Sequence, residues 1–144
     1  MSRADEPYFA SLTVPSRVES IRPAAAFLVQ AVKSLEVPVA SHTLFEVAIV
    51  EVLTNALRHG NKGQEDASIV CEIEVAERQL TVRIFDAGGG FTLPAPVVLP
   101  ELDLDQVDLL PEAGFGMQVI HSVFPAVKTV HRGGRFGVEL PVSF

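Results

Sequence analysis

Three groups of residues in this 144-residue chain could carry chemistry. The first group, Glu51, Asn55 and Arg58, has the i, i+4, i+7 spacing that places side chains on one face of a helix. An unpaired buried carboxylate is costly, so a polar face on an otherwise apolar helix indicates a cleft that a ligand fills. A solvated helix end with ordinary surface charges accounts for the same residues, and the group alone does not decide between the two.

The second group begins with Asp86, which directly follows an apolar stretch expected to form a strand. A carboxylate at a strand end can accept a hydrogen bond from a ligand amine. Gly88 and Gly90 would let the backbone approach a flat ring, because they carry no Cβ. The same residues are also typical of an ordinary turn, so this group is ambiguous by itself.

The third group is Gly114, Phe115, Gly116 and Met117, at the start of an expected helix over 115–123. Glycines at a helix entry leave backbone N–H groups and the positive end of the helix dipole available to phosphate oxygens. Alternatively, the two glycines only let the chain turn sharply into the helix.

The elements that position these groups begin with a short strand over 8–14 and a helix after it. Ser16 followed by Glu19 predicts a capping box at the start of this helix. Pro23 lies inside the predicted helix, where it either kinks the helix or moves its start towards Arg22.

The second helix, which carries the first polar group, is expected over 41–59, with Ser41 as its N-cap and Gly60 just past its last turn. Alternating apolar residues then predict two strands, over 69–75 and 80–84, joined as a hairpin.

A long loop over 88–113 follows, with repeated glycines and prolines and five acidic residues in its second half. Loops of this length in a compact domain are usually functional. After the third helix, two last strands are expected over 126–131 and 135–144, joined by Gly133-Gly134, the dipeptide that a type I′ turn favours.

This order of elements predicts an α+β fold, a two-layer sandwich in which three helices cover one face of a mostly antiparallel mixed sheet of about five strands. The length favours a single domain over residues 1–144. Hydrophobic residues make up 48% of the chain and charged residues 20%, which excludes wholesale disorder.

The net charge of −7 argues against a dominant surface for nucleic acid or for anionic membranes, because both need clustered Lys and Arg. No stretch approaches the roughly 18 consecutive apolar residues of a membrane span, so we expect a soluble protein. The single cysteine, Cys71, excludes an internal disulfide and fits the reducing cytoplasm, where we expect the protein to be located.

Taken together and in this order, the three groups resemble the sequence boxes of the GHKL ATPases. The stretch Glu51–Gly60 resembles their N-box, Asp86–Gly90 their Asp-x-Gly-x-Gly box, and Gly114–Met117 their second glycine box. The resemblance extends over about 12–142, and the short layout is most similar to the anti-sigma-factor serine/threonine kinases of bacterial partner-switching systems. It implies the GHKL (Bergerat) ATP-binding fold, with a mobile lid at about 88–113.

The resemblance also implies ATP and Mg²⁺ as cofactors, and a role for each residue of the boxes. Asn55 would bind Mg²⁺, and Glu51 would act as general base on the incoming hydroxyl. Arg58 would face the phosphates, and Asp86 would accept a hydrogen bond from the adenine amino group. The other residues would line the nucleotide, with Gly88 and Gly90 at the ring and Gly114, Phe115, Gly116 and Met117 at the triphosphate.

The partners implied by the resemblance are an anti-sigma-factor antagonist, which is a STAS-domain protein and accepts the phosphoryl group, and a sigma factor, which is sequestered. A homodimer is implied as well, without direct contact to nucleic acid or membrane. A detached histidine-kinase catalytic domain is disfavoured, because the chain is too short to include a dimerising pair of phosphoacceptor helices.

Two departures from the family pattern keep a second function open. No Lys or Arg occurs from Ala87 to Val127, and Gly133-Gly134-Arg135-Phe136 stands where the family commonly has Gly-Thr. The alternative is a regulatory module that binds its partners in a nucleotide-dependent way without productive kinase activity.

Overall fold

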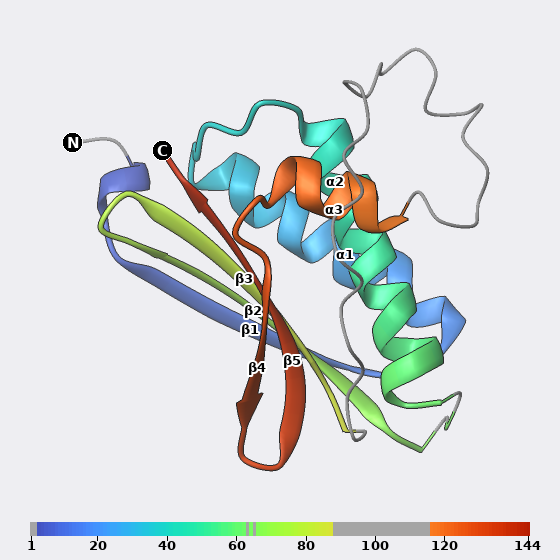
Figure 1. Cartoon of the computed structure of the whole chain (residues 1–144). Helices are drawn as coiled ribbons and strands as arrows, with labels where there is room; N and C mark the ends of the chain where they lie inside the picture. The colour runs from blue at the N-terminus through green and yellow to red at the C-terminus, as the bar shows by residue number, and fades with distance from the viewer. Residues whose placement is uncertain (1–2, 63, 65, 88–115) are drawn as a thin grey trace.

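The computed structural model describes residues 3–62, 64, 66–87 and 116–144, which form a layer of helices on a sheet (Figure 1). The strands are β1 (Tyr8–Pro15), β2 (Ser68–Ala76), β3 (Gln79–Asp86), β4 (Lys128–Arg132) and β5 (Arg135–Ser143). The helices are α1 (Val18–Ser34), α2 (His42–Asn55) and α3 (Gly116–Val123), together with a short 3-10 helix, η1 (Arg3–Asp5), and a π-helix, η2 (Ala56–Gly60).

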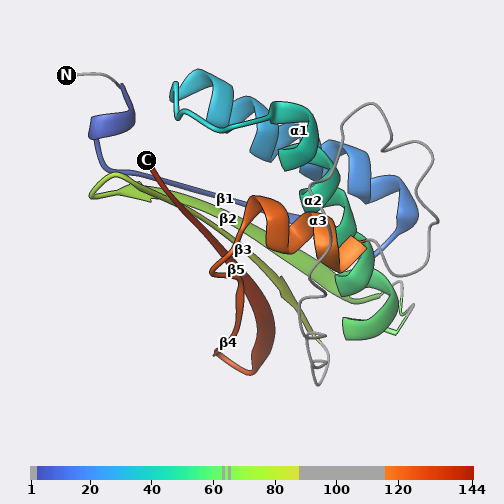
Figure 2. The same cartoon turned by 45° about the horizontal axis from the view of Figure 1, so that its top comes forward.

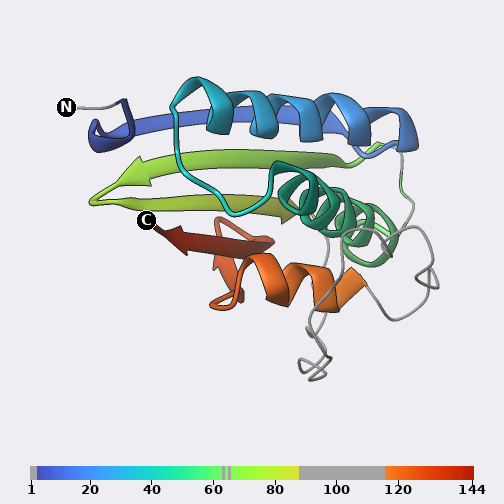
Figure 3. The ribbon, with the colours of Figure 1, turned by 90° about the horizontal axis from the view of Figure 1, so that it is seen from above.

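The strands form one sheet in the order β1-β2-β3-β5-β4. Every strand pairing among the described residues is antiparallel, so the sheet is not mixed as the sequence analysis allowed. Helices α1, α2 and α3 lie on the same face of this sheet, as Figures 2 and 3 show from two directions. The predicted α+β fold is therefore confirmed.

The core lies between the helices and the sheet, and the alternation of apolar residues along the strands produces it. Ile73 of β2 and Val82 of β3 are fully buried, as is Leu28 of α1. Each side chain of this kind contributes about 1.5–3 kcal/mol by leaving water. The ring of Phe45 in α2 lies 5.7 Å from the ring of Phe124, which directly follows α3, so the two helices share one core. Within the described part of the chain, no helix is long and apolar enough to cross a membrane.

The start of α1 differs from the sequence prediction. The helix begins at Val18, its N-cap is Arg17, and no side chain makes a capping hydrogen bond there. The Ser16 hydroxyl instead accepts a hydrogen bond from Asn61 Nδ2 at 2.9 Å, so the predicted capping box is wrong. Pro23 lies within the helix, and the alternative start near Arg22 is wrong as well.

Helix α2 begins as the sequence predicts, since the Ser41 hydroxyl caps it by accepting a hydrogen bond from the Leu44 N–H at 3.1 Å. Its other end differs. The last turn of the predicted helix widens into η2, where the Asn61 N–H donates to the Ala56 carbonyl at 2.8 Å. Gly60 therefore lies inside the π-helix and does not follow the helix as a C-terminal cap. Single π turns of this kind are frequent at functional sites.

Tight turns close both hairpins of the sheet. Gly133 and Gly134 have φ values of 56° and 77°, in agreement with the predicted type I′ turn. The β2–β3 turn has similar φ values, 51° at Glu77 and 60° at Arg78. This left-handed backbone conformation is unfavourable for residues that carry a Cβ. Arg78 is held in this turn by Asp5, because its Nη1 lies 2.9 Å from Asp5 Oδ1.

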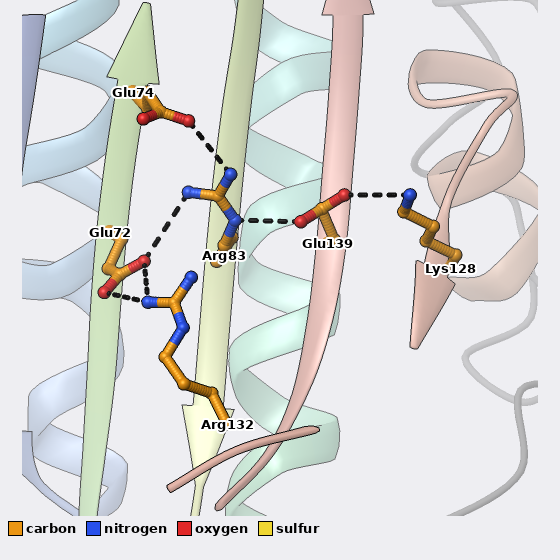
Figure 4. Close-up of polar contacts among 6 residues, drawn as sticks. All are labelled: Glu72, Glu74, Arg83, Lys128, Arg132 and Glu139. Carbon is orange, nitrogen blue, oxygen red and sulfur yellow. Dashed lines mark hydrogen bonds and ion pairs between the residues drawn. The ribbon is translucent and has the colours of Figure 1, made fainter. Parts of the chain in front are cut away.

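Ion pairs cross the face of the sheet that the helices leave uncovered (Figure 4). Arg83 of β3 donates to Glu74 of β2 at 2.9 Å and to Glu139 of β5 at 2.8 Å. Arg132 at the end of β4 reaches Glu72 of β2 at 2.8 Å, and Glu72 is only 8% exposed. These pairs and the pair of Lys128 with Glu139 connect four strands of the sheet, β2, β3, β5 and β4.

The ion pairs predict a pH dependence of stability. The hydrogen bond from Arg83 lowers the pKa of Glu139 below its ordinary value of 4.5. A group with a lowered pKa in the folded state stabilises the fold above its unfolded-state pKa, and this contribution is lost as the pH falls through the folded-state value. We therefore expect Glu139→Gln to reduce the free energy of unfolding at neutral pH, and the difference from the parent to shrink as the pH falls below 4.5.

Urea unfolding at several pH values measures this difference. The exposed turn residue Glu77 provides the control Glu77→Gln, for which we expect little change. A deficit of Glu139→Gln that is the same at every pH would show that the ionised carboxylate does not carry the effect.

Candidate functional site

Helix α2 and its π-helical extension form the spine of the site. Glu51 and Asn55 are half-buried, one turn apart on α2, as the sequence predicts. Arg58 belongs to η2 and is exposed. The i+7 relation between Glu51 and Arg58 assumes an unbroken α-helix, and the π turn interrupts that helix between the two residues.

The end of this spine touches the end of β3. Asp86 is the last residue of β3 and is 2% exposed. A Cβ atom added to Gly60 would overlap the carboxylate of Asp86, so only a glycine allows this close approach. Two of the predicted boxes therefore meet here, the N-box at Gly60 and the aspartate of the second box.

The third box meets the same spine at Glu51. Gly116 is the first residue of α3, and a Cβ atom added there would overlap the carboxylate of Glu51. The spine thus connects a carboxylate at Asp86 with a second carboxylate and an amide at Glu51 and Asn55.

Asn61 is a residue that the sequence analysis missed. It is 2% exposed, and its side-chain amide contacts three chain segments at once. Its Nδ2 donates to the Ser16 hydroxyl at 2.9 Å and to the Ser68 carbonyl at 3.2 Å, and its Oδ1 accepts from the Ala87 N–H at 2.8 Å. The only signal in the sequence was an asparagine just after a predicted helix, which is common at helix ends.

The β5 end of the site carries the departure from the family pattern. Phe136 pairs with Asp86 in the β3–β5 register and carries no hydroxyl. Arg135 of β5 donates to the hydroxyl of Ser68 at 2.8 Å, across β3 on β2. The position opposite the aspartate is therefore a buried ring, 4% exposed, which contacts the ring of His131 edge-on.

The remaining predicted site residues divide into two sets. Met117 is half-buried on α3 and packs against the hydrophobic core. The others lie outside the described residues, as does the predicted lid over 88–113; they are Gly88, Gly90, Gly114 and Phe115.

The donor set at the α2 end fits a magnesium ion. The Asn55 side chain offers an amide oxygen, a hard donor of the kind that Mg²⁺ prefers. Gly116 has no Cβ, so the start of α3 lies close to the Glu51 carboxylate, one turn from Asn55. With Asn55 as its protein ligand, the ion would take its other ligands from water and phosphate oxygens, which is usual for Mg²⁺.

Comparisons with known proteins identify the family of the chain. A model of the histidine kinase-like ATPase domain family matches residues 14–141. The chain is 29% identical over 91 residues to serine-protein kinase RsbW of Listeria innocua, covering 62% of this chain and 58% of that protein. It is 31% identical over 77 residues to the anti-sigma F factor of Clostridium botulinum, covering 54% of this chain and 52% of that protein. The chain thus spans little more than half the length of these curated relatives.

A solved structure shares the fold. It is the crystal structure of the RsbU and RsbW domains of a Mycobacterium tuberculosis protein. The match covers 94% of this chain and 32% of the solved chain, with a TM-score of 0.59 and 13% sequence identity. The family model covers most of the chain, and the elements that carry the N-box, the strand-end aspartate and the second glycine box meet along one helix. The chain belongs to the histidine kinase-like ATPase domain family, and its relatives include proteins named serine-protein kinase RsbW and anti-sigma F factor, as its sequence boxes predicted.

Proposed function

We propose that this chain is an ATP-binding serine/threonine protein kinase of the anti-sigma-factor type. It phosphorylates an anti-sigma-factor antagonist, a STAS-domain protein, and in its other complex sequesters a sigma factor. The observation that carries the proposal is the pair of close approaches along one helix, Gly60 against Asp86 and Gly116 against Glu51. They support one cleft with a base-recognition end and a phosphate end.

At the base end, the Asp86 carboxylate accepts a hydrogen bond from the adenine amino group, and Gly88 and Gly90 line the ring. Asp86 is almost fully buried, so little water competes for a hydrogen bond to its carboxylate. At the phosphate end, the backbone N–H groups near the start of α3 donate hydrogen bonds to the phosphate oxygens, since a helix N-terminus favours anions. The residues involved are Gly114, Phe115, Gly116 and Met117.

In phosphoryl transfer, Glu51 takes the proton from the serine or threonine hydroxyl of the antagonist as the hydroxyl oxygen bonds to the γ-phosphorus. The bond from that phosphorus to the β–γ bridging oxygen breaks, and ADP leaves. Asn55 would hold Mg²⁺ through its amide oxygen, and the bound ion would neutralise charge on the phosphates. Arg58, exposed on η2, supplies further positive charge near the phosphates.

The alternative function has its own supporting observation. No Lys or Arg occurs between Ala87 and Val127. The predicted lid therefore offers no basic side chain to stabilise the phosphoryl group during its transfer. A protein with this lid could bind ATP to control partner binding without transferring phosphate.

One experiment separates the two functions. Purified chain is incubated with Mg-ATP labelled at the γ-phosphate and with a candidate STAS-domain antagonist. Label that appears on serine or threonine of the antagonist supports the kinase. Partner binding that depends on ATP, with no label transferred during a long incubation, supports the regulatory module and contradicts the kinase.

We also propose a homodimer formed through β1 and α1. β1 is an edge strand of the sheet, and Phe9 on it is 56% exposed. Beside it, Tyr8 and α1 residues including Phe27 line an apolar groove. Sedimentation of the parent as a dimer, and of Phe9→Ser with Phe27→Ser as a monomer, would support this interface, whereas a monomeric parent would contradict it. A cytoplasmic location, without direct binding of nucleic acid or membrane, remains part of the proposal.

A further inference from the structure

Asn61 connects the ends of three strands beside the proposed base site. Ser16 directly follows β1, Ser68 begins β2 and Ala87 directly follows β3, and the buried amide of Asn61 bonds to all three. The backbone N–H of the same residue closes the π turn by donating to the Ala56 carbonyl. The end of η2 is therefore tied to one end of the sheet through a single side chain.

Two contacts, one made by Gly60 and one by Asn61, bear directly on Asp86 and the residue after it. Gly60 lies so close to the Asp86 carboxylate that no Cβ fits between them. Asn61 Oδ1 accepts from the N–H of Ala87, the next residue in the chain, at 2.8 Å. The pair Gly60-Asn61 thus fixes the pair Asp86-Ala87 at its side chain and at its backbone.

We propose that Asn61 is a positioning residue for nucleobase recognition. Through Ala87 it holds the Asp86 carboxylate where it can accept a hydrogen bond from an exocyclic amine, and it does not touch the nucleotide itself. This inference rests on the proposed function, since it assumes that Asp86 reads the base. It differs from a purely structural role, in which Asn61 only pins strand ends and contributes to overall stability.

Two variants separate positioning from structure. Asn61→Ala removes every side-chain bond of the amide. Ser16→Ala removes one of the bonds that the amide donates and leaves the bond to Ala87 intact. Both variants should lower the melting temperature, because each disturbs a buried polar group.

The test is calorimetric titration of the full chain with Mg-ATP and with Mg-ITP, in which a carbonyl replaces the 6-amino group. We expect the parent to prefer ATP and Asp86→Asn to lose this preference. Asn61→Ala should reduce the preference by about fivefold, the value of roughly one hydrogen bond. Ser16→Ala should keep it within about twofold.

The outcomes are distinct. If Asn61→Ala melts earlier but keeps the preference of the parent, Asn61 is only structural and the inference is overturned. The same holds if Ser16→Ala loses the preference as fully as Asn61→Ala, because this variant keeps the bond to Ala87, which would then not carry the effect. If the parent has no preference, or Asp86→Asn keeps it, the proposed role of Asp86 fails, and this inference fails with it.

Discussion

Replacing Glu51 with Gln is expected to slow phosphate transfer to the protein substrate by at least about a hundredfold, the usual contribution of a general base. Affinity for Mg-ATP should stay within about threefold of the parent. Glutamine has the shape of glutamate and fits beside Gly116, where space is limited, but it cannot take the proton from the hydroxyl. The measurement is single-turnover transfer of labelled phosphate, together with the dissociation constant of the nucleotide.

Helix α2 offers a matched control for this variant. Glu46 lies on the same helix and is exposed, so Glu46→Gln makes the same chemical change away from the site. We expect it to transfer phosphate at the parent rate. Transfer by Glu51→Gln at the rate of Glu46→Gln would show that Glu51 is not the base.

Replacing Gly60 with Ala is expected to weaken ATP binding by about tenfold or more. The added methyl would overlap the Asp86 carboxylate, so the carboxylate or the end of η2 must move. Relieving such an overlap in a packed site typically costs about 1–3 kcal/mol. Because Asp86 is the proposed contact of the base, its displacement should reduce affinity as well as stability.

Gly137 provides the control for this substitution. A Cβ there would overlap the ring of Phe85, which lies on the sheet face opposite the helices. Gly137→Ala should therefore lower the melting temperature and leave the nucleotide affinity of the folded protein close to that of the parent. Equal losses of affinity in the two variants would mean that Gly60 has no special relation to the base site.

Much of the fold could be predicted because it depends on local patterns. Alternating apolar residues marked β2 and β3, Ser41 marked the start of α2, and Gly133-Gly134 marked the last turn. The start of α1 could not be predicted correctly, because Ser16 has two possible partners. Its hydroxyl bonds with Asn61, which lies 45 residues away in the sequence and comes close only in the folded chain.

The site was predictable as a set of boxes, but not in its geometry. The order of the boxes placed Glu51, Asp86 and Gly116 in one cleft, and the close approaches to Gly60 and Gly116 agree with this arrangement. The π turn was not predictable, because it adds one residue to a single turn and leaves no periodic signal in the sequence. It interrupts the helix between Glu51 and Arg58, which the i+7 spacing had treated as regular. Asn61 was missed because one buried amide carries no pattern in a single sequence.

The most direct test of the central claim, that one cleft along α2 binds a nucleoside triphosphate, is calorimetric titration with ATP in the presence and absence of Mg²⁺. We expect the parent to bind ATP more tightly with Mg²⁺, Asn55→Ala to lose this gain while keeping metal-free binding, and Asp86→Asn to bind weakly in both conditions. A parent that does not bind ATP, or an Asn55→Ala variant that keeps the full gain from Mg²⁺ together with an Asp86→Asn variant of unchanged affinity, would contradict the account.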